Sequence, residues 1–171
     1  MFQKVDPKTL TENVFSLLGD RWTLITAGTA EDCNTMTASW GGLGVLWGEP
    51  VVTIYVRPQR HTRAFLEKSP YFTLSFFREG EYRKELALCG AKSGSELNKF
   101  EACGFTVETD GHGAPYVGQA DLVLVCEKQY ADTIKPACFL DRAAEEKWYP
   151  QKDHHTMYIG RVVTCLKRTG A

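Results

Sequence analysis

Long apolar runs are missing from this sequence of 171 residues. The N-terminus lacks the uninterrupted apolar stretch that an export signal needs, and no run of about 18 apolar residues follows it. We therefore expect a cytoplasmic protein that does not enter a membrane. An excess of positive charge is missing too, because 20 Lys and Arg stand against 21 Asp and Glu and the formal net charge is -1. Without a general positive field, the chain is not expected to bind nucleic acid.

The patterns of metal sites and disulfide frameworks are also missing. The six cysteines are scattered, no two of them form a Cys-x-x-Cys pair, and the chain has only four histidines. We therefore expect no metal site and interpret the cysteines as small core residues of a reducing compartment. His154 and His155 are neighbours near an expected strand, where successive side chains point to opposite faces, so they cannot readily converge on one ion.

No internal repeat and no linker rich in Ser, Gly or Pro interrupts the chain, so residues 1–171 are expected to form a single domain. What the chain does have is a series of short β-rich segments separated by turns, which is typical of a barrel or a sandwich. The clearest is 51–56, which is β-branched or aromatic throughout and is bounded by Pro50 and Pro58. The expected strands are 22–29, 35–40, 51–56, 71–77, 105–108, 122–127 and 155–166.

Helices are expected to be few and short. The hydroxyl of Thr62 can cap one of them. Ser93 and Glu96 stand in capping-box register and predict the start of another, which Gly104 closes. Two further segments mix charged positions with an apolar face. The expected helices are 62–68, 81–88, 93–103 and 141–148.

Small hydroxyl side chains in one expected strand leave its backbone accessible to a flat ligand. Gly41, Gly42 and Gly44 follow directly and remove Cβ atoms where a ligand could approach closely. The glycine fingerprint of dinucleotide-binding folds, the phosphate loop and the nucleophile elbow of hydrolases are all absent. A purely structural strand rich in Ser and Thr is the alternative interpretation. The residues of this segment are Asn34, Thr35, Met36, Thr37, Ala38, Ser39 and Trp40.

A second segment brings positive charge to the expected start of a helix. Arg57, Arg60, His61 and Thr62 follow the strand 51–56. The first turn of a helix has free backbone N–H groups, and guanidinium groups can hold phosphate oxygens in a forked geometry. The alternative is a capped helix with solvated arginines on its rim. An anion site beside an accessible strand suggests a phosphorylated flat cofactor.

Five segments carry a family resemblance through their order and spacing. They are 34–40, 56–62, 71–77, 93–100 and 153–160. Together they resemble the flavin reductase-like, FMN-binding split-barrel family, which includes the flavoredoxins, over residues from about Val14 to Leu166. The resemblance implies a mainly β fold, a six-stranded Greek-key split β-barrel with a few short flanking helices. It also implies a homodimer that holds one FMN per subunit near its interface.

The resemblance also implies roles for individual residues. The strand 35–39 would face the flavin ring and the ribityl chain largely through its backbone, and the Arg/His/Thr segment would receive the phosphate. His155 would lie near the open face of the flavin, where the family binds nicotinamide or a flavin substrate, and is the candidate catalytic residue. The expected cofactor-binding residues are Asn34, Thr35, Met36, Thr37, Ala38, Ser39, Trp40, Arg57, Arg60, His61, Thr62, Ser75, Phe76 and Phe77.

The expected function is that of an FMN-dependent oxidoreductase of the flavin reductase type. NAD(P)H would deliver a hydride to the flavin N5, and free flavin or another small molecule would accept the electrons. The alternatives are a flavoredoxin-like electron carrier, which passes electrons between redox proteins, and a barrel that binds another phosphorylated ring such as a pyridoxal derivative. The family often has Arg and Asp where this chain has Ser95 and Asn98, and Glu where it has Arg161. These differences weaken the expectation that NAD(P)H is the hydride donor more than the expectation that the chain binds FMN.

Overall fold

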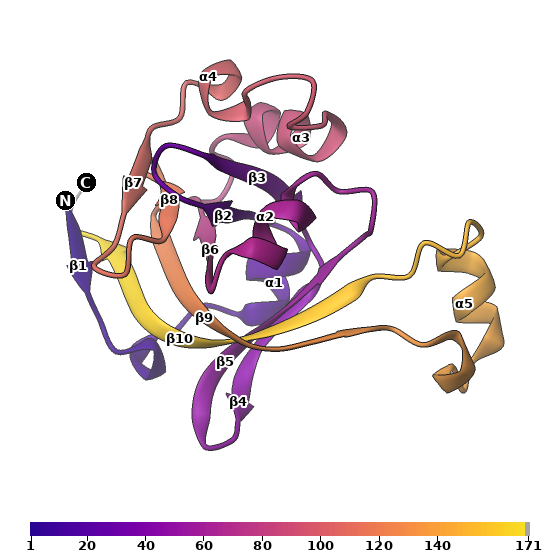
Figure 1. Ribbon diagram of the computed structural model, residues 1–171. Helices are drawn as coiled ribbons and strands as arrows, with labels where there is room; N and C mark the ends of the chain where they lie inside the picture. The colour runs from indigo at the N-terminus through magenta and orange to yellow at the C-terminus, as the bar shows by residue number, and fades with distance from the viewer. Residues whose placement is uncertain (170–171) are drawn as a thin grey trace.

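The computed structural model describes residues 1–169, which form an eight-stranded antiparallel sheet, a two-stranded sheet and short helices (Figure 1). The large sheet has the order β3-β2-β6-β9-β10-β5-β4, and β1 pairs with the C-terminal end of β10. Its strands are β1 (Phe2–Lys4), β2 (Thr23–Gly28), β3 (Cys33–Ala38), β4 (Gly41–Leu46), β5 (Glu49–Val56), β6 (Tyr71–Phe76), β9 (Leu122–Thr133) and β10 (Thr156–Arg168). The small sheet pairs β7 (Val107–Thr109) with β8 (Pro115–Val117).

The helices are short and lie around the strands, as expected for the mainly β class, which is confirmed. No helix of residues 1–169 has the length and apolar character needed to cross a membrane. The helices are α1 (Val14–Gly19), α2 (Thr62–Lys68), α3 (Arg83–Ala91), α4 (Lys99–Cys103) and α5 (Arg142–Trp148), with 3-10 turns η1 (Pro7–Thr9) and η2 (Pro136–Cys138).

The core lies on both faces of the first half of β9, which explains the continuous apolar run from Leu122 to Cys126. Leu122 and Leu124 pack into a cluster with Phe72 and Phe76, whereas Val123 faces a second cluster that is covered by α3, α4 and the small sheet. Side chains alternate between faces along a strand, so a strand that is covered on both sides has apolar residues at every position. Each fully buried side chain of this kind contributes about 1.5–3 kcal/mol.

The large sheet has eight strands, whereas the resemblance implies six. The segments of β1 and β4 are not among the strands expected from the sequence, because the short β1 and the glycine-rich β4 carry little apolar signal. Three of the six residues of β4 are glycines. Trp47 and Gly48 form the two-residue turn to β5 with φ angles of 53° and 79°. Positive φ at both turn positions matches the hairpin turn whose twist fits paired strands. This turn and the pairing with β5 therefore stabilise β4 as a strand, although the composition of 41–46 does not predict one.

One expected helix start and one expected helix cap are wrong. The segment from Ser93 forms a turn in which the Glu96 N–H donates to the Ser93 carbonyl, and α4 begins only at Lys99. Its cap is Asn98, whose Oδ1 accepts from two backbone N–H groups of the first turn at 3.0 and 3.3 Å. Asn98 satisfies two free donors of the helix start, so it defines the start in place of Ser93. Thr62 does not cap α2 through its side chain, which instead accepts a hydrogen bond from Asn34.

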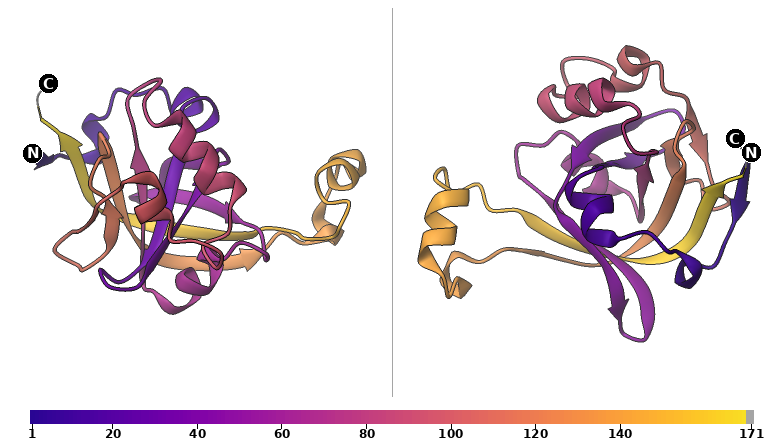
Figure 2. Two further views of the ribbon diagram at one scale, coloured as in Figure 1. Left: turned by 90° about the horizontal axis from the view of Figure 1, so that it is seen from above. Right: turned by 180° about the vertical axis from the view of Figure 1, so that it is seen from behind.

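An arm, residues 130–156, leaves the barrel where β9 and β10 continue past their neighbours (Figure 2). It carries η2 and α5, and both views in Figure 2 show it projecting from the rest of the chain. Leu140 in the arm is fully exposed, and Trp148 is 46% exposed. Cys138 is also exposed here, in contrast to the core position expected of the cysteines, whereas Cys89, Cys126 and Cys165 are buried.

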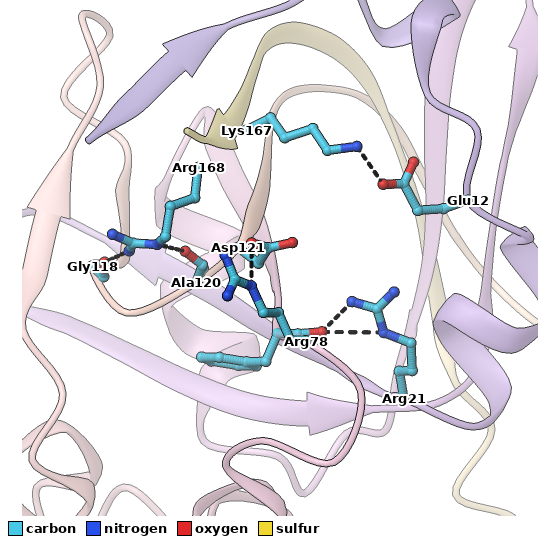
Figure 3. A network of polar contacts seen from close by, with 9 residues as sticks. Glu12, Arg21, Arg78, Gly118, Ala120, Asp121, Lys167 and Arg168 are labelled. Carbon is cyan, nitrogen blue, oxygen red and sulfur yellow. Dashed lines mark hydrogen bonds and ion pairs between the residues drawn. The ribbon is translucent and has the colours of Figure 1, made fainter. Parts of the chain in front are cut away.

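Polar contacts hold the segment after β6 and the end of β10 (Figure 3). Arg21 Nε donates to the Phe77 carbonyl at 3.1 Å, and Lys167 Nζ lies 2.7 Å from Glu12 Oε1. Arg168 Nε donates to the carbonyl of Ala120 at 2.9 Å. The end of β6 is therefore anchored in the body of the protein.

Candidate cofactor site

A cleft of about 220 Å³ opens where β3 and β5 end and α5 approaches them. Eight of the expected site residues line it, drawn from β3, the segment that follows β5, and the start of β10. Its lining residues are Met36, Thr37, Ala38, Ser39, Trp40, Tyr55, Arg57, Arg60, Trp148 and His155. The structure thus brings the hydroxyl-rich strand and the two arginines together in one site.

The free edge of β3 forms one wall of this cleft. β3 stands at one end of the strand order, so only β2 pairs with it in the sheet. The Thr35 carbonyl accepts from Lys99 Nζ at 2.9 Å and therefore points away from β2. Backbone groups alternate in direction along an antiparallel strand, so the N–H and C=O of Thr37 face the same free edge. This edge offers backbone hydrogen bonds to a ligand.

Two arginines bring positive charge to the cleft, and that of Arg60 is not compensated by a carboxylate of residues 1–169. Arg57 binds Asp153, but Arg60 Nη1 donates to the Gly90 carbonyl at 2.6 Å, and no carboxylate of residues 1–169 forms an ion pair with it. Burial, and then the charge of Arg57, lower the pKa of the Arg60 guanidinium. A partly buried cation with no anionic partner favours binding of an anion, and forked guanidinium donors suit a phosphate group.

Aromatic rings form the opposite side of the cleft. The rings of Trp40 and Trp148 meet edge to face at 5.1 Å, and Trp40 lies 5.3 Å from His155. Tyr55 meets the His155 ring at 6.5 Å. Both tryptophans remain partly exposed, at 41% and 46%. Trp40, an expected cofactor-binding residue, therefore offers a stacking surface at the cleft.

His155 is held in the neutral form. Its Nδ1 lies 2.8 Å from the hydroxyl oxygen of Tyr149. Burial, followed by the charge of Arg57, lowers the pKa of His155 to about 4. Near neutral pH the imidazole therefore carries no charge, and it can form hydrogen bonds without adding to the positive charge of the arginines.

His154 has its own hydrogen-bond partner, although its ring, like that of His155, packs against Tyr149. Its Nε2 lies 3.1 Å from Glu145 Oε1, which Lys152 Nζ also approaches at 2.8 Å. In the part of the chain that the structure describes, no group of three or more His, Cys, Asp or Glu side chains is placed to hold a metal ion.

A second cleft of about 800 Å³ adjoins the first, because both are lined by Ser39, Trp40 and Tyr55. It is mainly apolar, with Phe15 and Leu43 among its lining residues. The first cleft alone is smaller than the roughly 300–1,000 Å³ of ordinary ligand sites. The two together provide room for a larger ligand that has a charged end and a flat apolar end.

Seven expected site residues do not line the first cleft. Asn34, Thr35 and Thr62 are buried, and Asn34 Nδ2 donates to Thr62 Oγ1 at 2.7 Å. A Cβ added at Gly94 would collide with the Asn34 side chain, so the loop from Ser93 closes over this pair. The seven are Asn34, Thr35, His61, Thr62, Ser75, Phe76 and Phe77.

The four remaining members of this group pack elsewhere. The rings of His61 and Phe65 meet edge to face at 5.4 Å. Ser75 Oγ accepts from the backbone N–H of Val117 at 3.3 Å, and Phe76 and Phe77 are buried in the two core clusters. Their side chains therefore support the barrel and do not line the first cleft, and the expected position of residues 75–77 beside the flavin ring stays a prediction.

The structure adds Tyr55 and Trp148 to the cleft. Ile54 and Val56 of β5 are buried, and Tyr55 lies between them. Because side chains alternate along a strand, the side chain of Tyr55 lies on the face opposite to these two. No sequence signal connects Trp148 to Trp40, because their contact depends on the direction in which the arm leaves the barrel.

The fold and this cleft define the class of protein. The chain is a mainly β, split-barrel protein with a site at the open edge of its sheet. The model of the flavin reductase like domain matches residues 15–171, and the chain belongs to this family. The resemblance stated from the five sequence segments is thereby confirmed. No curated protein sequence matches the chain.

Several solved structures share the fold. An FMN-binding protein from Thermus thermophilus with bound p-hydroxybenzaldehyde is 20% identical with a TM-score of 0.70, covering 98% of this chain and 83% of that one. A flavoredoxin from Methanosarcina acetivorans is 18% identical with a TM-score of 0.66, covering 97% and 75%. An NADH:FAD oxidoreductase from Streptomyces globisporus in complex with NAD and FAD fragments is 21% identical with a TM-score of 0.64, covering 86% and 74%.

Proposed function

We propose that the cleft binds FMN and that the protein is an FMN-dependent oxidoreductase of the flavin reductase type. NAD(P)H is the proposed hydride donor, and free flavin or another small molecule is the proposed acceptor. The observation that carries this proposal is the position of Arg57 and Arg60 in one cleft with the free edge of β3. Membership of the flavin reductase-like family and the FMN-binding proteins among the structural neighbours support it.

The donors present in the cleft fit FMN. The guanidinium of Arg60 lacks a carboxylate partner within residues 1–169 and can neutralise part of the charge of a phosphate. The free edge at Thr37 offers backbone donors to a heteroaromatic ring, and Trp40 offers a stacking surface. The polar and aromatic groups therefore match the two chemically different ends of the cofactor.

In the proposed mechanism, the cofactor carries out the redox chemistry and the protein binds and orients it. FMN, when bound, supplies a ring that accepts a hydride at N5. Arg57 and Arg60 bind and orient its phosphate, and the backbone of β3 holds its ring. Trp40 and Trp148 restrict the access of water, and the neutral His155 offers a hydrogen bond at the open side of the cleft. No side chain of the chain has to act as a nucleophile or to carry a proton.

We also propose that two copies of the chain form a homodimer through exposed apolar side chains of the arm, of α1 and of the turn between β4 and β5. Phe15, Trp47 and Leu140 are exposed by 90%, 63% and 102%, and Trp148 adds a further apolar surface. Large exposed apolar surfaces of this kind are typical of protein interfaces. A second copy that covers them would also close the apolar cleft next to the proposed FMN site.

The alternative is a flavoredoxin-like carrier that keeps FMN and exchanges electrons only with protein partners. Two residues favour it, because they replace charged residues that are frequent in the family. Asn98 Oδ1 is occupied by the backbone of α4, and the Ser95 hydroxyl lies 2.8 Å from that of Ser93. Neither offers a charge to a nicotinamide nucleotide.

Identification of the chromophore, followed by anaerobic reduction, tests the proposal. The purified protein is expected to show flavin absorption, and heating is expected to release FMN that mass spectrometry identifies. NADH or NADPH should then bleach the flavin bands of the holoprotein. Inertness towards both nucleotides would favour the carrier, whereas a colourless protein that does not bind FMN at saturating concentration would contradict both functions. A released pyridoxal derivative would instead favour a barrel that binds another phosphorylated ring.

A further inference from the structure

We propose that Tyr149 is a positioning residue that holds His155 in a single neutral tautomer, with the proton on Nε2 and directed to the cleft. The hydroxyl oxygen of Tyr149 and Nδ1 of His155 are 2.8 Å apart, and His155 lines the cleft. The contribution of this pair to catalysis rests on the proposed function, but the tautomer itself does not require a bound cofactor.

The direction of the hydrogen bond follows from the donors available. If Nδ1 carried the proton and donated to the phenol oxygen, the phenol proton would need another acceptor. Within residues 1–169 the hydroxyl of Tyr149 has no other side-chain or carbonyl partner, and Tyr149 is only 4% exposed. A buried donor without a partner costs about 1–3 kcal/mol. The phenol O–H therefore donates to Nδ1, and the imidazole proton lies on Nε2.

Burial supports the same arrangement. It raises the pKa of Tyr149 and outweighs the opposing effects of the Arg57 charge and of the His155 backbone. The phenol therefore keeps its proton near neutral pH and remains a donor.

The charges around His155 keep it neutral while it accepts this bond. Arg57, Arg60 and His154 disfavour the imidazolium, whereas the carboxylate of Asp153 favours it. Burial is the largest contribution, and the pKa of His155 falls to about 4. A neutral imidazole with an acceptor at Nδ1 has one proton left to donate, and this proton is on the side away from Tyr149.

The Tyr149 ring is fixed, so the hydroxyl cannot swing away. It stacks on His154 at 4.5 Å with an interplanar angle of 19°, and the Arg57 guanidinium carbon lies 5.1 Å from its centroid. Phe139 packs against it at 5.9 Å. Since α5 and its following turn carry Tyr149, the arm determines the hydrogen-bonding character of a residue in the cleft.

The consequence for the site is that His155 acts as a donor. Its Nε2–H can bind and orient an acceptor atom of the ligand, such as a carbonyl oxygen or a ring nitrogen with a lone pair. It cannot take a proton from the ligand at this atom, and it does not supply one by dissociation near neutral pH. We therefore infer a role in orientation and not in general acid–base catalysis.

Nitrogen-15 NMR of the full chain with labelled histidine tests the tautomer directly. Long-range proton–nitrogen correlations distinguish Nδ1–H from Nε2–H, and His155→Gln assigns the signals of His155. We expect the Nε2–H tautomer in the wild type, without protonation above about pH 5. In Tyr149→Phe, which keeps the ring but removes the hydroxyl, we expect a mixture of the two tautomers. Tyr130→Phe is the matched control, because Tyr130 is an exposed tyrosine of the same arm whose hydroxyl lies 3.2 Å from Asp132.

Three results would overturn the inference: an Nδ1–H tautomer in the wild type, an unchanged tautomer in Tyr149→Phe, or an equal change in Tyr130→Phe. If Tyr149→Phe does not fold, the wild-type spectrum alone decides. FMN titration of the same sample separates this inference from the proposed function. Binding of FMN together with an Nδ1–H tautomer would refute only the role of Tyr149. The Nε2–H tautomer without any FMN binding would refute the proposed function and leave the pair of residues as a structural feature.

Discussion

Arg57 and Asp153, which lie 96 positions apart in the chain, form an ion pair with 2.5 Å between Nη1 and Oδ2. Gln59 Nε2 donates to the same carboxylate oxygen at 2.8 Å. The bonds from Gln59 and then Arg57 lower the pKa of Asp153 to about 2. These contacts connect the end of β5 to the arm and thereby position both Arg57 and His155 at the cleft.

Replacing Asp153 with Asn should make the protein less stable, with a loss that depends on pH. The folded-state pKa of Asp153 is about 2 and lies below the unfolded value of 3.8, so the carboxylate stabilises the fold fully above the unfolded value. This contribution decreases as the pH falls through 3.8 towards about 2. Urea unfolding of both proteins is expected to show a constant difference above about pH 5 that narrows below pH 4. A difference that does not change with pH would contradict this interpretation.

Gly160→Ala should destabilise the fold, because β10 crosses the core closely at this position. A Cβ at Gly160 would lie 2.6 Å from two ring atoms of Phe72 and 2.8 Å from the Cβ of Cys126. Excess volume in a packed core costs about 1–3 kcal/mol. Gly42→Ala is the matched control, since a Cβ there meets no atom within 4 Å. Denaturant unfolding should show the loss in Gly160→Ala only, and equal stabilities of the two variants would refute the packing argument.

Leu140→Glu should separate the proposed dimer without unfolding its subunits. Leu140 is 102% exposed in the single chain, so a charge at this position costs the isolated subunit little. Light scattering after size-exclusion chromatography is expected to give the mass of two chains for the wild type and of one chain for the variant. Ala87→Glu is the control, because it adds the same charge at an exposed position of α3, outside the arm. A monomeric wild type, or dimers of unchanged stability in Leu140→Glu, would refute the proposed interface.

Local patterns predicted the fold where apolar residues recur at regular spacing, as in β5 and β9. These patterns failed where another nearby residue or a distant partner strand determined the element. The capping-box register predicted a helix start at Ser93, but α4 starts after Asn98, whose side chain accepts from two N–H groups of α4. The glycines of β4 concealed a strand that depends on its turn and on its partner β5.

The sequence predicted those site residues that lie within one of the short segments with a recognisable pattern. Thr37 and Arg60 come from the two segments that the sequence singled out, and both line the cleft. Trp148 could not be found, because its position depends on the trajectory of the arm. Phe76 and Phe77 belong to a segment of the family pattern, but an apolar pattern does not distinguish a side chain that faces a ligand from one that faces the core.

The most direct test of the account is an FMN titration of the apoprotein, followed by fluorescence, for the wild type, Arg60→Ala and Arg63→Ala. Arg60 lines the cleft, whereas Arg63 pairs with Glu67 on α2. A hydrogen bond to a charged group contributes about 1.5–3 kcal/mol, so the affinity of Arg60→Ala should fall roughly 10- to 100-fold. Arg63→Ala should bind as the wild type does, and the reduction of FMN bound at saturation should change little in either variant. Equal affinity of Arg60→Ala and the wild type, or a wild type that does not bind FMN, would contradict the account.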